Sequence, residues 1–421
     1  MGYLQRVVDQ VLDDLFPYTA AIALEGAKGV GKTATAAQRA TSTLSLDDGA
    51  QRSALAADLG LIDRLTPPVL IDEWQLLPPI WDRVRRGVDQ SAEGGRFLLT
   101  GSAQVAAGAR LHSGAGRILS VIMRPMSLAE RGLTSPTVSL RALLGGIESR
   151  IEGQTDVALP DYAEEVVRSG FPGIRDLPPR VRRAQLNGYL SRIVERELPE
   201  NGMAVRQPAA LRAWLTAYGA ATSTDAAYTV ILDSATPGES DKPARQTVAQ
   251  YREHLQRLFI LDPISPWIPS FTPLKRLAKT PKHHLVDPAL AAALFGVDVD
   301  ALLGGITAPG PAGMWLGALF ESLVAQSVRV YAEAAEATVG HLRTQNGDHE
   351  IDLIVEGPGM RVVAIEVKLA AAVDDKDVRH LNWLKGQIGD RLVERIVVNT
   401  GQFAYRRPDG VAVIPLALLG P

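Results

Sequence analysis

The sequence contains no cysteine among its 421 residues. Disulfide bonds and thiolate metal sites are therefore excluded, and we expect a reducing location, the cytoplasm. No apolar run approaches the roughly 20 residues that a membrane-spanning helix needs, so we expect no membrane partner. Residues 1–14 carry charges where a secretory signal has an apolar core, and Arg6 stands where N-myristoylation requires Ser or Thr.

An excess of charge of one sign is also absent. The chain has 44 Lys and Arg against 47 Asp and Glu, which gives a formal net charge of −3. A chain with this balance is not drawn to phosphate as a whole, so contact with nucleic acid requires a local basic patch. The length and the 46% of hydrophobic residues predict a large enzyme or machine of about two to four domains.

The most informative motif is GAKGVGKT at residues 26–33, which fits the phosphate-binding pattern G-x-x-x-x-G-K-[ST] at every position. An apolar run at 20–24 predicts a strand before it, and an alanine-rich segment at 34–40 predicts a helix after it. In that context backbone N–H groups point at one anion, and glycines remove side chains that would block its approach. The motif predicts ATP as ligand, with Lys32 on the β- and γ-phosphates and Thr33 on Mg²⁺. The expected nucleotide-binding residues are Gly26, Ala27, Lys28, Gly29, Val30, Gly31, Lys32 and Thr33.

Acidic and hydroxyl side chains follow two further apolar runs. Asp72 and Glu73 come directly after the run at 69–71, as when a buried parallel strand delivers acids to the carboxyl edge of a sheet. We expect Asp72 to hold Mg²⁺ through water. Successive side chains of a strand point to opposite sides, so Glu73 should lie on the other side from Asp72, where it should polarise the attacking water. The run that ends at residue 99 is followed by Thr100 and Ser102, whose hydroxyls we expect beside the γ-phosphate as sensors.

One arginine is a candidate for stabilising charge on the γ-phosphate. Arg117 follows a glycine shortly after the predicted sensor strand, and Arg110 is the second choice. Such an arginine acts within one chain or across a subunit boundary, so the sequence allows both a monomer and a homo-oligomer. The alternative is that Arg117 is an ordinary surface arginine.

Composition and pattern divide the chain into four predicted domains. In the middle of the chain, helices are expected at 211–218, 225–232 and 244–259, followed by short strands at 260–261 and 284–286. Helices followed by a two-stranded wing describe a winged helix-turn-helix, which binds either nucleic acid or another protein. The predicted domains are an ATPase core at 1–135, a helical lid or linker at 136–207, the winged-helix region at 208–312 and a C-terminal domain at 313–421.

A loop rich in positive charge joins the two expected strands of the wing. If the wing binds DNA, this loop is its contact surface, because it is the densest basic patch in the sequence. The alternative is that its charges are merely solvated. The loop carries Lys275, Arg276, Lys279 and Lys282.

Charged residues interrupt two apolar strands near the C-terminus. Asp352 lies in the strand expected at 350–355, and Glu366 and Lys368 share one face of the next strand. Charges in such surroundings are costly unless they converge on one another or on a metal ion. With Glu321 on the preceding helix they form the constellation of PD-(D/E)xK nucleases, in which carboxylates hold Mg²⁺ and Lys368 orients water. The alternative is a buried ion pair in a nuclease-derived scaffold that does not cut.

Over nearly its full length the chain resembles the prokaryotic AAA-type ATPases that carry a C-terminal domain of unknown function, built from a winged helix and a nuclease-like fold. Three departures are a charge at Lys28 in the loop, Trp74 after the acids, and an insertion at 236–241 that weakens the case for groove reading. The matching stretches are 24–33, 70–75, 98–102, 116–117, 125–130, 282–287, 320–321, 350–352 and 365–368.

The resemblance implies an α/β protein with a P-loop parallel-sheet domain, a helical winged-helix middle domain and an α/β nuclease-like C-terminal domain. Two functions compete. In the first, ATP hydrolysis drives a protein that acts on or senses DNA. In the second, the chain is a nucleotide-gated signalling or toxin-like switch that binds protein partners and has no nuclease activity.

Overall fold

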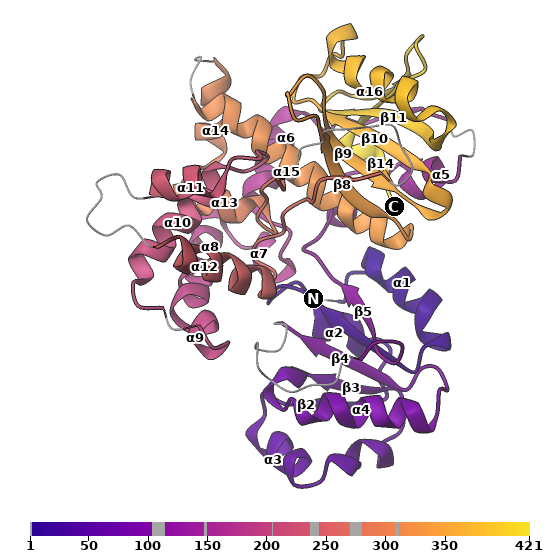
Figure 1. Ribbon diagram of the computed structural model, residues 1–421, viewed down its shortest axis with the longest axis vertical. Helices are drawn as coiled ribbons and strands as arrows, with labels where there is room; N and C mark the ends of the chain where they lie inside the picture. The colour runs from indigo at the N-terminus through magenta and orange to yellow at the C-terminus, as the bar shows by residue number, and fades with distance from the viewer. Residues whose placement is uncertain are drawn as a thin grey trace. The chain divides into compact units, whose positions relative to one another are not determined.

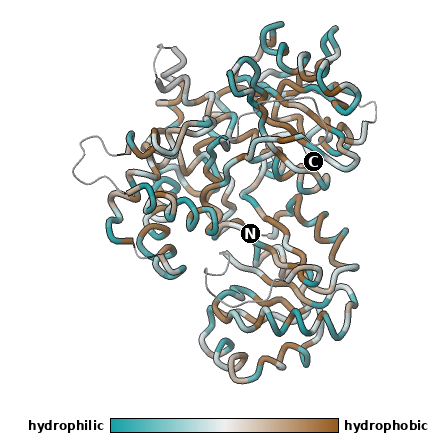
Figure 2. The backbone as a smooth tube through the Cα atoms, in the orientation of Figure 1, coloured by the Kyte–Doolittle hydropathy of each residue, from teal (hydrophilic) through white to brown (hydrophobic). Residues whose placement is uncertain are grey.

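The computed structural model of the protein describes residues 2–102, 114–146, 150–203, 205–235, 244–269, 280–307 and 311–421. The chain divides into two compact units, of which the first comprises residues 1–124, 196–204 and 253–260, and the second comprises the rest. Figure 2 shows the hydrophobic residues concentrated along the strands of both large sheets. Within the described ranges, no helix combines the length and the apolar character needed to cross a membrane.

The first unit is built on a parallel sheet (Figure 1). Its described strands lie in the order β2-β3-β4-β1-β5, and each neighbouring pair is parallel. The central strands are almost entirely apolar and buried, as expected when helices cover both faces of a parallel sheet. Because β4 lies between β1 and β3, the ends of these three strands meet at one edge. The strands are β1 (Ala21–Glu25), β2 (Ser42–Ser45), β3 (Val69–Asp72), β4 (Phe97–Gly101) and β5 (Leu119–Ile122).

Helices cover this sheet with apolar residues at helical spacing. Ile80 and Val84 of α4 pack against strand residues such as Ile71 and Leu99, and Leu55 of α3 joins the same core. Local signals fix the helix starts: the side chain of Asp48 accepts the N–H of Ala50 at the start of α3. The helices and 3₁₀ turns are α1 (Val7–Leu15), η1 (Phe16–Tyr18), α2 (Lys32–Ala37), α3 (Gly49–Ala57), η2 (Leu59–Arg64), η3 (Trp74–Leu76) and α4 (Pro79–Gln90).

The middle of the chain is helical. Helices α10, α11 and α12 lie where three helices were expected, and Trp214 of α10 contacts the rings of Tyr218 and Tyr251. The two short strands expected after them form isolated antiparallel bridges, which pair Leu261 with Leu285 and Ile264 with Lys282. The helices are α6 (Leu159–Arg168), α7 (Pro172–Arg175), α8 (Pro179–Arg192), η5 (Ile193–Glu197), α9 (Leu198–Glu200), α10 (Pro208–Ala220), α11 (Tyr228–Ala235), α12 (Arg245–Arg257), α13 (Pro288–Phe295) and α14 (Val299–Thr307).

The C-terminal part of the second unit is a mixed sheet. Its described strands lie in the order β7-β12-β13-β11-β10-β9-β8, in which β10, β11 and β13 run parallel and the other pairs are antiparallel. Helix α16 crosses one face of the sheet (Figure 1), and its Val378, Leu381 and Leu384 enter the sheet's core. The elements are α15 (Pro311–Ala334), β8 (Thr338–Arg343), β9 (Glu350–Glu356), η6 (Pro358–Met360), β10 (Val362–Val367), α16 (Asp375–Ile388), η7 (Gly389–Arg391), β11 (Leu392–Asn399), β12 (Phe403–Arg406), β13 (Ala412–Pro415), η8 (Leu416–Leu418) and β14 (Leu419–Gly420).

The segment from 136 to 154 differs from the lid or linker predicted for it. Its strand β6 (Val138–Ser139) pairs with β14, and its strand β7 (Gly153–Gln154) extends the C-terminal sheet beside β12. Helix α5 (Leu140–Leu144) follows directly after β6. Two-residue strands are too short to show a hydrophobic period, so no sequence pattern indicates this pairing.

The predicted α/β class is confirmed. The protein has a parallel-sheet P-loop domain at its N-terminus, a helical middle region and a mixed-sheet C-terminal domain.

Candidate functional site

The loop between β1 and α2 forms a glycine-dependent cradle. Gly26, Gly29 and Gly31 have φ angles of 150°, 85° and 106°, a region that side chains rarely adopt. A Cβ atom added at Gly26 would lie 2.1 Å from the backbone oxygen of Met123. Gly26 is therefore required for close packing of the loop against the residue after β5, and the positive φ angles give the loop the glycine-dependent turns of a phosphate-binding loop.

Lys32 lies inside this loop with its ammonium buried. Its Nζ donates to the backbone oxygens of Gly26 at 2.8 Å and Ala27 at 2.9 Å. Burial lowers the pKa of Lys32 from 10.5 to about 8, although the carboxylates of Glu73 and Asp72 oppose this shift. The protein therefore holds an incompletely compensated positive charge at the loop, as an anion site requires.

Lys32→Met should raise the free energy of unfolding at pH 7, measured without nucleotide, by roughly 1–3 kcal/mol, because it removes a buried charge. The pKa of Lys32 is lower in the folded than in the unfolded chain. The destabilisation caused by burying the charged ammonium is therefore fully present below about pH 8. From pH 8 toward 10.5 the unfolded chain binds more protons, and wild-type stability rises with pH. Urea unfolding across this range should show the difference between the two proteins shrinking; a constant difference would contradict the assignment.

A hydroxyl pair converges on the acid at the end of β3. Thr33 donates its hydroxyl to Asp72 Oδ1 at 2.8 Å, and Thr100 donates to the same oxygen. Asp72 and Thr100 are paired in the register of β3 and β4, so the sheet itself sets this contact. An oxygen set of one carboxylate and one loop hydroxyl suits Mg²⁺ bound together with a nucleotide.

Glu73 does not continue the strand. Its φ of 52° and ψ of 43° turn the chain, so strand alternation does not place its carboxylate on the opposite side from Asp72 as predicted. Both carboxylates instead act on the pKa of Lys32. Glu73 accepts hydrogen bonds from Gln75 Nε2 and, at 3.4 Å, from the Ser102 hydroxyl.

The remaining predicted residues of this domain lie apart from that constellation. Lys28 forms an ion pair with Glu197 at 2.8 Å, within the same compact unit. Arg117 pairs with Asp89 at 2.8 Å, and its side chain is 45% exposed. Its role as an arginine finger stays a prediction, and Arg110 lies outside the described residues.

Sequence reasoning missed two residues that shape the loop and its acids. Arg6 is buried and donates from Nη1 to the backbone oxygen of Val30 at 2.8 Å, so it braces the loop from helix α1's N-terminal side. Gln75 holds the Glu73 carboxylate. For Arg6, the only sequence signal was its position directly before the amphipathic helix α1. For Gln75, no local pattern indicated a role.

A second cluster of charges lies at the C-terminal sheet. Lys282 Nζ is 2.9 Å from Glu321 Oε1, 3.0 Å from Asp352 Oδ1 and 3.5 Å from Glu350 Oε1. Glu321 comes from α15 and Asp352 from β9, so the predicted convergence of these acids is present. We call Glu321, Asp352 and Glu366 the acid cluster.

Glu366 and Lys368 complete the constellation from the end of β10. Lys368 Nζ lies 3.4 Å from Glu366 Oε2, and the Val367 N–H donates to Asp352 Oδ2 at 2.9 Å. Burial and the Asp352 charge raise the pKa of Glu366 well above its usual value, and they raise that of Glu321 to about 8. Burial acts in the same direction on Asp352, but Lys282, the Val367 N–H and Lys368 together outweigh it and hold the pKa of Asp352 below its usual value.

Lys282 corrects the prediction of an exposed basic loop. Lys282 is 1% exposed, and its ammonium pairs with carboxylates and is not available to a nucleic acid. The other members of the predicted patch, Lys275, Arg276 and Lys279, lie outside the described residues. Within the described ranges, no group of three His, Asp or Glu side chains is arranged to hold a metal ion.

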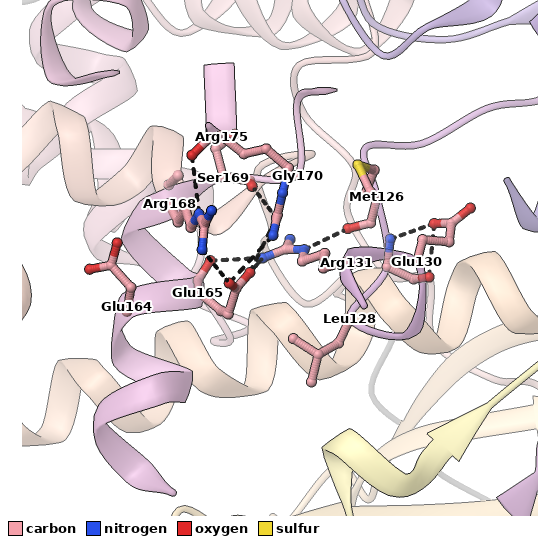
Figure 3. A network of polar contacts seen from close by, with 12 residues as sticks. Met126, Leu128, Glu130, Arg131, Glu164, Glu165, Arg168, Ser169, Gly170 and Arg175 are labelled. Atoms are coloured by element: carbon pink, nitrogen blue, oxygen red, sulfur yellow. Dashed lines mark hydrogen bonds and ion pairs between the residues drawn. The ribbon is translucent and has the colours of Figure 1, made fainter. Parts of the chain in front are cut away.

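Within the second unit, a buried ionic network joins residues 126–131 to helices α6 and α7 (Figure 3). Glu165 Oε2 accepts from Arg131 at 2.9 Å and from Arg175 at 3.2 Å, and Arg168 lies within ion-pair distance. Burial lowers the pKa of Arg175, and the Glu165 charge opposes this shift. Ser127 belongs to the same segment, where its N–H and hydroxyl donate to Glu130.

Comparison with protein families divides the chain into three matched regions. Residues 18–131 match the AAA domain. The N-terminal domain is therefore similar to the AAA domain over this region. Residues 159–301 and 316–419 match two domains of unknown function, DUF8612 and DUF4143.

Similar proteins add no defined activity. The chain is 23% identical over 400 residues to the uncharacterized proteins Rv2008c of Mycobacterium tuberculosis and Mb2031c of Mycobacterium bovis, covering 94% of this chain and 79% of each relative. Among solved structures, the Walker-type ATPase paby2304 of Pyrococcus abyssi matches with 15% identity and a TM-score of 0.38, over 70% of this chain and 96% of that chain.

Proposed function

We propose that the AAA-type domain binds ATP with Mg²⁺ and hydrolyses it to ADP and phosphate. The observation that carries this proposal is the convergence of Thr33 and Thr100 on Asp72, directly beside a glycine cradle that contains Lys32. In this proposal Lys32 contacts the β- and γ-phosphates, while Thr33 and Asp72 hold Mg²⁺. When bound, Mg²⁺ neutralises charge that develops on the phosphate oxygens.

The remaining groups act on the attacking water and on the γ-phosphate. Glu73 accepts the proton of the water, and Gln75 orients its carboxylate. In this proposal Ser102, which contacts Glu73, and Thr100, which contacts Asp72, sense the γ-phosphate. Arg117 is proposed as the arginine finger. In that role it would first have to leave Asp89, and it would then reach the γ-phosphate either of its own chain or of a neighbouring chain in a homo-oligomer.

We further propose that this ATPase acts on or senses nucleic acid through its second unit. Helices α10–α12 with the bridges that follow them support a winged helix, and the order α15-β8-β9-β10-α16-β11 with its acids supports a nuclease-like fold. DNA contact would involve Lys275, Arg276 and Lys279, since Lys282 is buried.

ATP turnover should rise when the protein binds its nucleic acid. The test measures steady-state ATPase rates at fixed salt with no DNA and with single-stranded, duplex and junction DNA. Lys32→Met serves as the inactive control. Stimulation by one DNA form that weakens with salt supports the nucleic-acid function; ATPase activity that none of the forms changes contradicts it and leaves the ATPase assignment intact.

A second candidate function is a nucleotide-gated switch that binds protein partners. The burial of Lys282 favours it, because the residue is withdrawn from the basic loop and neutralises acids of the nuclease-like constellation. In that case hydrolysis is slow and indifferent to DNA, and no nuclease activity accompanies it.

A further inference from the structure

We propose that the Lys282 ammonium is the resident cation of the acid cluster. In wild-type protein it stands where a divalent cation would otherwise bind, and replacing it with an uncharged side chain opens a divalent-cation site. This inference concerns the C-terminal domain and does not depend on the proposed ATPase activity.

The distances support an exchange of ammonium for metal. Lys282 Nζ lies 2.9 Å from a Glu321 oxygen and 3.0 Å from an Asp352 oxygen, which come from different elements. Carboxylate oxygens bind Mg²⁺ or Ca²⁺ at about 2.0–2.6 Å, so each oxygen needs to move inward by less than about 1 Å. Glu350, 3.5 Å from Nζ, lies within reach as a further oxygen donor.

The backbone around Lys282 holds the ammonium in place. The N–H of Lys282 donates to Ile264 O at 2.9 Å, and the N–H of Ile264 donates back to Lys282 O at 2.9 Å. The next residue, His283, is tied by its N–H to Thr224 O and by its oxygen to the N–H of Ser223, both at 2.8 Å. Because this strand-like segment is fixed on both edges, Lys282 is a permanent member of the cluster rather than a side chain that swings in.

A buried oxygen of Glu366 points to a ligand position in the same cluster. The residue is 4% exposed, its carboxyl group is hydrogen-bonded with Asp352, and its Oε1 has no hydrogen-bond partner among the described residues. An unpartnered buried carboxyl oxygen is costly, and a cation would satisfy it. Lys282 engages Glu321 and Asp352, and the Glu366 carboxyl is tied to Asp352 and, through Oε2, to Lys368 at 3.4 Å. Its Oε1 is thus an unused oxygen of the same cluster, available to a metal that replaces the ammonium.

A fixed lysine charge has a functional consequence. Metal-dependent phosphodiester cleavage requires a cation that binds and polarises the phosphate, whereas an ammonium surrounded by carboxylates offers neither an open position nor a bound water. Lys282 instead ties the segment around residue 282 to α15 and β9. The nuclease-like domain of the wild-type protein then acts as a binding module.

Binding of Mn²⁺ to the full-length, nucleotide-free chain tests this inference. Asp72→Asn is introduced throughout, so that the P-loop acid does not contribute, and Mn²⁺ binding is measured by calorimetry and by electron paramagnetic resonance. The Asp72→Asn protein should bind no Mn²⁺ at millimolar concentrations. Adding Lys282→Met should create a single site per chain, and further addition of Asp352→Asn should abolish it. Lys376→Met, which removes an exposed lysine paired with Asp374, should create none.

Two outcomes would overturn the proposal. One is Mn²⁺ binding by the Asp72→Asn protein that Asp352→Asn removes, since the acids would then hold a metal with Lys282 present. The other is a folded Lys282→Met protein that binds no Mn²⁺. If Lys282→Met unfolds in EDTA, recovery of its thermal transition with Mn²⁺ supports the proposal. Failure of Mn²⁺ to restore the thermal transition overturns it.

Discussion

Glu73→Gln should leave ATP bound but lower turnover by roughly 10²–10⁴-fold, the usual contribution of a positioned general base. The amide keeps the shape of the side chain and its contacts with Gln75 and Ser102, but it cannot accept a proton from water. Lys32, Thr33 and Asp72, which we propose hold ATP and Mg²⁺, are unchanged. Steady-state turnover and equilibrium titration with labelled ATP measure the two effects separately.

A matched substitution separates this effect from a general loss of charge. Glu93 is an exposed glutamate of the same domain, between α4 and β4, and Glu93→Gln should leave both turnover and ATP affinity unchanged. The role assigned to Glu73 would be rejected if Glu73→Gln retained turnover within a few-fold of wild type. Lost ATP binding in this variant would instead make Glu73 part of the binding site.

Glu165→Gln should destabilise the second unit by roughly 3–5 kcal/mol, the usual cost of leaving buried charge uncompensated. The residue is 2% exposed, and its carboxylate pairs with Arg131 and Arg175, whose buried guanidinium groups would then lose this shared counter-charge. Figure 3 shows that these arginines approach the same carboxylate from different segments, so one substitution weakens both ion pairs. Urea unfolding monitored by circular dichroism measures the change in stability.

An exposed ion pair of the same unit provides the control. Glu152 lies 3.5 Å from Arg150 with both side chains largely exposed, and Glu152→Gln should change stability by less than about 1 kcal/mol. If both variants stayed within that range, the network of Figure 3 would hold no more energy than a surface pair.

Local sequence was sufficient where a function depends on neighbouring residues. The cradle at 26–33 depends on glycines and a lysine that lie within eight consecutive residues. The apolar run before Asp72 determines that this acid ends a buried strand. Period-two spacing likewise predicted that Glu366 and Lys368 would share a face, and the two side chains do lie 3.4 Å apart. In each case contiguous residues and backbone geometry carry the information.

Tertiary structure decided what depends on distant segments. In the sequence Lys282 is one member of a basic loop. Packing brings it against Asp352, which lies 70 residues later in the sequence, and removes it from solvent. The turn at Glu73 and the pairing of β7 with β12 are similar cases, since neither a positive φ at glutamate nor a two-residue strand has a local signature. The sequence by itself determined that Asp352 and Glu366 lie on apolar strands. Only the fold determined which charges they meet, because a buried charge is stabilised by whichever opposite charge the packing brings within about 3–4 Å.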